Sequence, residues 1–114
     1  MENINSNNIE NNFFFIRVKK NKLIKIKSQD IYMINSIGDY VRIHTANQKY
    51  TVHTTMKSII SRLPVNDFIR VHQSHIVNID KITEINFANC IVNNKEIPIS
   101  VAERKKLLNR IKIL

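Results

Sequence analysis

Cysteine, glycine and acidic residues are scarce in this chain of 114 residues. The single cysteine, Cys90, allows no internal disulfide and no thiolate metal cluster, and its apolar neighbours predict a small buried residue rather than a redox sensor. With Gly38 as its only glycine, the chain has no loop of the kind that cradles phosphates. No apolar run approaches the roughly 20 residues that a bilayer crossing needs, so membrane insertion is not expected.

The N-terminal segment "MENINSNNIENN" has neither the basic start nor the apolar stretch of a secretory signal, so a cytoplasmic protein is expected. It holds six of the sixteen asparagines, which predicts a disordered tail or a linker stub over residues 1–12. From Phe13 onward no Gly- or Ser-rich interruption marks a second boundary. We therefore expect one domain over residues 13–114.

Positive charge is what the chain has in excess. Lys and Arg outnumber Asp and Glu by 18 to 9, so the formal net charge is +9. Such an excess biases a soluble domain toward polyanions, although it says nothing about the fold. The hydrophobic content of 43% is that of an ordinary soluble globule.

Most of the chain alternates apolar and polar residues with the period of two that is typical of strands. The runs "YVRIHT" and "KYTVHT", separated by a tight turn at residues 46–48, predict a hairpin, and "FFFIRV" and "KLIKI" predict another around residues 20–21. The runs "TEINF", "CIV" and "EIPI" predict short strands joined at residues 88–89 and 93–94, where asparagine tolerates left-handed turn geometry.

Two segments follow a helical period instead. In "TTMKSIISRLP" the apolar residues recur at helical spacing from Met56 to Leu63, Thr54 or Thr55 supplies an N-cap, and Pro64 ends the run. In "SVAERKKLLNRIKIL" a capping box of Ser100 and Glu103 begins a second helix. Its apolar side carries Leu107, Leu108, Ile111 and Leu114, and its exposed flank carries Arg104, Lys105, Lys106 and Arg110.

The polar cluster in "FIRVHQSHIVNIDKI" suggests a metal site or a nucleophile, but neither fits well. In an extended segment His72 and His75 project to opposite faces, so they cannot share one ion without a turn. Ser74 lies beside histidines but in no Gly-x-Ser-x-Gly turn, and the nine carboxylates form no obvious pocket pair. We therefore expect no metal, no cofactor and no catalysis.

Recognition is the remaining reading of this cluster. Arg, His, Gln and Ser side chains can donate to phosphate oxygens and base edges, and the flanking apolar residues would hold them on a rigid sheet. The competing interpretation is a solvated strand edge with satisfied histidines.

Four segments, in this order, resemble the LytTR-type DNA-binding domain of bacterial transcription regulators: "DIYMINSIGDYVRIHT", "KYTVHTTMKSIISRLP", "FIRVHQSHIVNIDKI" and "IPISVAERKKL". They cover roughly residues 30 to 110, and the third is close to the family's most recognisable motif. The resemblance implies a mainly β fold, a layered sandwich of short antiparallel strands with two small helices. It also implies that edge loops, rather than a recognition helix, enter successive major grooves of a bent duplex.

The resemblance further implies three contact patches. "GDY" matches the first contact loop and points to Asp39 and Tyr40, with Arg42 nearby. "RVHQS" matches the second patch, where Gln73 takes a base-reading position because its amide can pair bidentately with adenine. The members of the second patch are His72, Gln73 and Ser74.

The third patch lies where "PIS" enters the last helix, at Ser100 to Lys105. Many relatives carry an arginine just after the serine, where this chain has Val101 and Ala102, so Arg104 and Lys105 are expected to hold phosphates instead. Arg70 is expected to support the motif by pairing with a carboxylate or a phosphate. Lys57, in the first turn of the first helix, is expected to meet the DNA backbone.

The expected partner is double-stranded DNA, with two copies bound to repeated half-sites and with a receiver domain attached in a longer protein. One alternative is a small basic β-domain for single-stranded RNA, which would need exposed aromatic rings, whereas the five phenylalanines lie in apolar contexts. The other alternative is a protein-interaction or dimerisation module, whose binding would resist salt.

Overall fold

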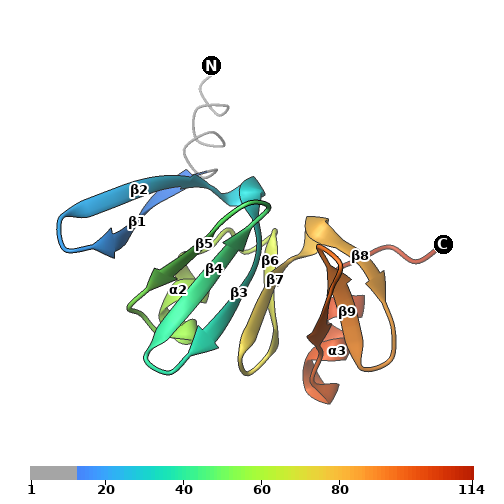
Figure 1. Cartoon of the computed structure of the whole chain (residues 1–114). Helices are drawn as coiled ribbons and strands as arrows, with labels where there is room; N and C mark the ends of the chain where they lie inside the picture. The colour runs from blue at the N-terminus through green and yellow to red at the C-terminus, as the bar shows by residue number, and fades with distance from the viewer. Residues whose placement is uncertain (1–12) are drawn as a thin grey trace.

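The computed structural model describes residues 13–114, so the predicted tail at residues 1–12 lies outside the described residues. Ten strands, two α-helices and two 3-10 helices follow one another along the described chain (Figure 1). The strands are β1 (Phe13–Lys19), β2 (Lys22–Lys27), β3 (Ile31–Ile37), β4 (Tyr40–Thr45), β5 (Lys49–Val52), β6 (Phe68–His72), β7 (His75–Asn78), β8 (Ile82–Ile85), β9 (Asn89–Val92) and β10 (Lys95–Pro98). The helices are α2 (Met56–Arg62) and α3 (Val101–Leu108), with η1 (Ser28–Asp30) and η2 (Ile79–Lys81) between strands.

The strands form three antiparallel sheets, which confirms the mainly β prediction. β1 and β2 make a two-stranded sheet, the central sheet has the order β5-β4-β3-β7-β6, and the third has the order β10-β9-β8. The predicted hairpins all form. Asn93 and Asn94 take φ values of 52° and 64° in the β9–β10 turn, as the left-handed turn prediction requires, and Gly38 takes 57° between β3 and β4.

Separate hydrophobic cores cover the two faces of the central sheet. Neighbouring residues of one strand alternate between them, because successive side chains point to opposite faces: Ile34 packs in the first core and Met33 in the second. The β1–β2 hairpin and α2 cover the first core, and the β8–β10 sheet and α3 cover the second. Cys90 is fully buried in the second core, where burial raises the pKa of its thiol to about 11.

Helix α2 confirms its prediction. Thr55 is the N-cap, and its hydroxyl oxygen accepts a hydrogen bond of 3.0 Å from the Ser58 N–H. Met56 and Ile59 are buried against the central sheet, and the helix ends two residues before Pro64. Within residues 13–114 no helix is long and apolar enough to cross a membrane.

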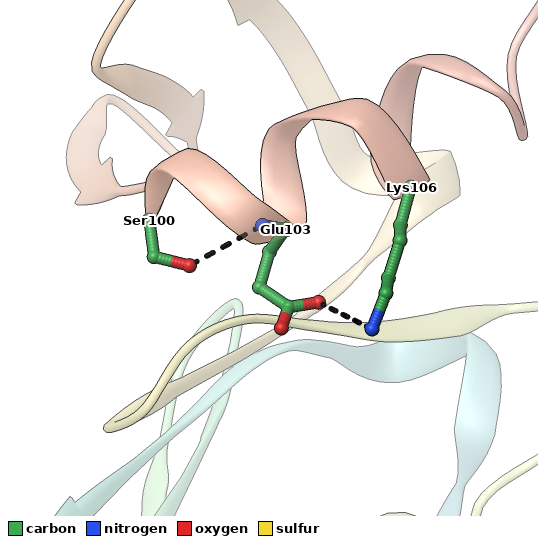
Figure 2. Close-up of polar contacts among 3 residues, drawn as sticks. All are labelled: Ser100, Glu103 and Lys106. Carbon is green, nitrogen blue, oxygen red and sulfur yellow. Dashed lines mark hydrogen bonds and ion pairs between the residues drawn. The ribbon is translucent and has the colours of Figure 1, made fainter.

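Helix α3 is shorter than predicted and its capping box is only half formed. The Ser100 hydroxyl accepts the Glu103 N–H at 3.4 Å, but the Ser100 N–H donates to the Val71 carbonyl at 2.8 Å. The Glu103 carboxylate is therefore left to pair with Lys106 at 3.6 Å (Figure 2). The hydrogen bond from Ser100 to Val71 holds the start of α3 against β6.

The prediction that the helix continues to the C-terminus is wrong, because α3 ends at Leu108. Only Leu107 of its apolar series is fully buried, and Leu114 is exposed because the chain leaves the core after Leu108. Arg110 is exposed, as predicted, and its guanidinium donates to the backbone carbonyls of Phe68 and Val65. These bonds hold the end of the chain against β6 in place of further helical turns.

Candidate nucleic-acid interface

An open groove of about 610 Å³ lies between the β3–β4 turn, the entry to α2 and the β6–β7 hairpin. Most of the residues predicted from the motifs line it, namely Asp39, Tyr40, Lys57, Arg70, His72, Gln73 and Ser74. They come from three elements that are far apart in sequence. The first two predicted patches are therefore one continuous surface.

Pairing between β3 and β7 brings the two turns together. Asn35 lies opposite His75 in the register, and one residue further along β3 the Ser36 N–H donates to the Ser74 carbonyl at 3.1 Å. Since β4 and β6 pair with β3 and β7 respectively, both turns lie at the same end of the strands of the central sheet (Figure 1). The sheet register thus sets the spacing between the two turns.

The segment predicted as one extended run is a hairpin that turns at Gln73 and Ser74. Arg70 stabilises it, because its Nε and Nη2 donate to the Gln73 carbonyl at 3.2 and 2.5 Å. Within residues 13–114 the partner of Arg70 is thus a backbone carbonyl rather than a carboxylate, and its expected pairing with a phosphate stays a prediction. The Gln73 side chain is exposed at the tip of this turn.

The turn also overturns the expectation that His72 and His75 point apart. Their ring centroids lie 5.7 Å from one another, and the Ser74 hydroxyl lies 3.0 Å from His72 Nδ1 and 2.9 Å from His75 Nδ1. Burial lowers the pKa of His75, and the charge of His72 lowers it further. In the described part of the chain no third potential ligand joins them at metal-binding distance. The Ser74 hydroxyl thus orders the two imidazoles at the base of the turn.

The other side of the groove is formed by Tyr40 and the α2 entry. Tyr40 is 47% exposed, and its ring centroid lies 4.9 Å from that of His53 with the planes tilted by 45°. The ring is thus partly packed and partly accessible. Asp39 and Lys57 are exposed on the rim, and sequence reasoning missed His53, whose signal was its place at the end of an alternating strand.

Arg42 does not belong to this groove. Val41 and Ile43 point into the first core, so Arg42 between them projects from the opposite face of β4. There it lies in register with Asn35 and near His44. Arg42 lies two residues from Tyr40 and projects from the same face of β4, but it does not line the groove, and its expected DNA contact stays a prediction.

The third predicted patch lies at the same end of the molecule as the two turns (Figure 1). The hydrogen bond from Ser100 to Val71 places the N-terminus of α3 beside the strand that leads to His72. Lys105 is exposed, whereas the Arg104 guanidinium donates to the carbonyls of Asn86 and Phe87. Arg104 therefore holds the β8–β9 turn. The sequence analysis predicted a phosphate contact for Arg104 and did not predict this structural role.

Two phenylalanines contradict the expectation that all five lie in apolar contexts. Phe87, in the β8–β9 turn, is 81% exposed, and Phe15, on the outer face of β1, is 57% exposed. Sequence reasoning missed Phe87, although its place between Asn86 and Ala88, at a predicted turn, was a signal for exposure.

Residues 21–112 match the family model described as LytTr DNA-binding domain. A similar curated protein is the sensory transduction protein LytT of Bacillus subtilis, 34% identical over 96 residues, which are 76% of this chain and 40% of that protein. Another is the heme-containing CO-sensing transcriptional regulator RcoM 1 of Paraburkholderia xenovorans, 28% identical over 79% of this chain and 38% of that protein. The chain thus spans about 40% of the length of these relatives.

Among solved structures, the LytTr DNA-binding domain of a response regulator from Bacillus cereus has the same fold. The TM-score is 0.70 and the sequence identity is 19%, with 85% of this chain and 96% of that chain covered. The family match extends over both turns of the groove and over α3. The chain belongs to the LytTR family of DNA-binding domains.

Proposed function

We propose that this domain binds double-stranded DNA sequence-specifically through the end that carries the β3–β4 turn, the β6–β7 turn and α3. In a regulator of transcription it serves as the DNA-binding output domain and catalyses no reaction. The proposal places the domain in the cytoplasm, where bacterial DNA lies. The observation that carries it is the exposed Gln73 amide on a turn that Arg70 holds rigid, beside the Tyr40 loop in one groove.

The chemistry of the groove supports direct readout. Gln73 can pair bidentately with adenine, and Tyr40, His53 and His72 add donors and aromatic edges around it. Lys57 and Lys105 are exposed cations at the same end and can neutralise phosphates. Base readout and phosphate contact would thus be made by different side chains.

Two further features belong to the proposal and follow from the family rather than from the groove. Two copies of the domain bind repeated half-sites. In a longer protein a receiver domain controls this output domain, as the length of the curated relatives allows.

The test is selection of bound duplexes from a random pool, followed by affinity measurements with two variants. Gln73→Ala should weaken binding to the selected duplex by about 1–3 kcal/mol and leave random duplex unaffected. Lys105→Ala, the matched control, should weaken both alike, because a phosphate contact carries no sequence information. Equal effects of both substitutions on both duplexes would contradict this division.

Single-stranded RNA is the competing ligand, since Phe15 and Phe87 are exposed. These two rings lie on different sheets, on β1 and in the β8–β9 turn, so they form no continuous stacking platform. Unlabelled RNA of random sequence should therefore fail to displace the selected duplex. Displacement at equal concentration would overturn the proposal.

A further inference from the structure

Phe87 is a large apolar side chain held out into solvent at the end of the molecule proposed to meet DNA. It lies in the β8–β9 turn and is 81% exposed. Val101, the first residue of α3, is 90% exposed. Exposed apolar side chains are common when scattered singly, so exposure alone would carry no inference. What distinguishes Phe87 is how firmly its turn is held.

Hydrogen bonds fix the turn at both ends. The Asn86 N–H donates to the Asn89 carbonyl at 2.9 Å, and the Asn86 side-chain oxygen accepts the Asn89 N–H at 2.9 Å. The Ile99 N–H donates to the Ala88 carbonyl at 2.9 Å, which ties the turn to the segment that enters α3. The backbone beneath Phe87 is therefore rigid.

Arg104 fixes the ring as well as the backbone. Its Nη1 donates to the carbonyls of Asn86 and Phe87, the latter at 3.0 Å, and its guanidinium carbon lies 5.5 Å from the centroid of the Phe87 ring. A guanidinium over an aromatic face is an attractive arrangement. One face of the ring is thus held by Arg104, and the ring stays largely open to solvent.

This projection is continuous with the proposed interface. Arg104 lies about one helical turn after Ser100, and the Ser100 N–H donates to the Val71 carbonyl, next to His72 of the groove. The β8–β9 turn, α3 and the β6–β7 turn lie at the same end of the molecule (Figure 1). A duplex bound at Gln73 and α3 would therefore extend toward Phe87.

We propose that Phe87 is an additional DNA-contacting residue that packs against thymine C5-methyl groups in the major groove, with Arg104 as its positioning residue. The inference rests on the proposed function, because it takes the same end of the domain to be the DNA-binding face. The C5-methyl of thymine is the apolar group that the major groove presents, and phenylalanine is among the side chains that contact it. The Arg104 guanidinium over the ring and the exposed Lys105, next to Arg104 on α3, favour a polyanion over an apolar protein surface.

The experiment uses the duplex selected by the unmodified domain and a second duplex in which uracil replaces thymine, which removes only the methyl groups. The unmodified domain should bind the uracil duplex about fourfold more weakly for each contacted methyl group. Phe87→Ala should bind the thymine duplex on the order of tenfold more weakly and should no longer distinguish the two duplexes. Phe87→Leu should retain part of the discrimination.

Matched variants separate the role of the ring from general effects. Phe15→Ala removes another exposed phenylalanine, on β1, and should bind both duplexes as the unmodified domain does. Arg104→Gln should reduce thymine discrimination because the ring loses its support. If Arg104→Gln instead lowers the salt dependence of DNA binding but still distinguishes thymine from uracil fully, Arg104 only neutralises a phosphate. That result would overturn its positioning role.

The outcomes distinguish this inference from the proposed function. If Phe87→Ala binds and discriminates as the unmodified domain does, while Gln73→Ala still loses specificity, Phe87 is no DNA contact and the proposed function stands. If Phe87→Ala changes only self-association or binding of single-stranded RNA, the inference is likewise overturned. If no duplex is selected at all, the proposed function itself fails.

Discussion

The pKa of His44 depends on its burial and on the positive charges around it. It lies on β4 with its Nε2 2.6 Å from the side-chain oxygen of Asn35. Burial, together with the positive charges of Lys95, Lys49 and Arg42, lowers its pKa from 6.5 to about 4. The imidazole is therefore neutral at physiological pH, although it lies on a strand of a strongly basic protein.

Protonation of His44 should oppose folding at acid pH. The unfolded chain takes up a proton near pH 6.5, whereas folded His44 takes it up only near pH 4, so the unfolded state binds more protons between these values. The free energy of unfolding should fall as the pH is lowered through this window. Urea unfolding at several pH values should show a shallower fall for His44→Gln. Identical pH dependence in both proteins would mean that His44 titrates normally.

Arginine side chains also show how neighbours set a residue's role. Arg70, Arg104 and Arg110 each donate to backbone carbonyls, at the β6–β7 turn, the β8–β9 turn, and the start of β6 with the segment before it. The planar guanidinium suits such contacts because it presents several fixed donors. A count of cations therefore overstates the charge that remains available for phosphates.

At the scale of elements, the turns depend on asparagine, because the chain has a single glycine. With one glycine, the β9–β10 turn relies on Asn93 and Asn94 in the left-handed region. Asparagine accepts this conformation better than other residues with a Cβ atom, because its short polar side chain can hydrogen-bond locally.

Substitutions at Asn94 should test this reliance. Asn94→Ala should lower the free energy of unfolding by about 1–2 kcal/mol, because a left-handed conformation is unfavourable for alanine. Asn94→Gly should be neutral or slightly stabilising, since glycine adopts positive φ without steric penalty. Asn109→Ala is the matched control: Asn109 is exposed with a φ of −72°, so little change is expected. The measurement is urea unfolding, and equal effects of Asn94→Ala and Asn109→Ala would refute the argument.

At the scale of the whole molecule, the positive charge is unevenly distributed. The β1–β2 hairpin and its turn contain six cations and no acidic residue: Arg17, Lys19, Lys20, Lys22, Lys25 and Lys27. This hairpin lies away from the β3–β4 and β6–β7 turns (Figure 1). The proposed DNA-binding end has fewer free cations, among them Lys57 and Lys105. Net charge alone therefore does not locate the interface.

Salt dependence should reveal which cations take part. The logarithm of the DNA association constant should fall linearly with the logarithm of the salt concentration. Each phosphate contact contributes about −0.9 to the slope of this line. Lys57→Ala should make the slope shallower by about one phosphate contact, whereas Lys22→Ala, in the hairpin, should leave it unchanged. Titration of the selected duplex at several salt concentrations measures both. A larger effect of Lys22→Ala would place the duplex against the hairpin instead.

The sequence by itself determined the local structure and the family. The period of two predicts the strands, the N-cap candidates Thr54 or Thr55 and Ser100 predict the helix starts, and "FIRVHQSHIVNIDKI" carries the family motif. These features depend on residues close together in the chain, where backbone geometry and capping act directly. The end of α3 could not be predicted, because it depends on Arg110 reaching the carbonyl of Phe68.

Only the tertiary structure decided which of the predicted residues meet. The pairing of β3 with β7 brings Tyr40 and Gln73 into one groove, which Arg42 does not line. The Arg104 contacts that hold the β8–β9 turn join residues seventeen and eighteen positions apart. Such contacts depend on strand register and on packing between sheets, and a register shift of one residue would turn every side chain to the other face. The physical reason is that a site assembled across sheets is encoded in long-range pairing rather than in any one motif.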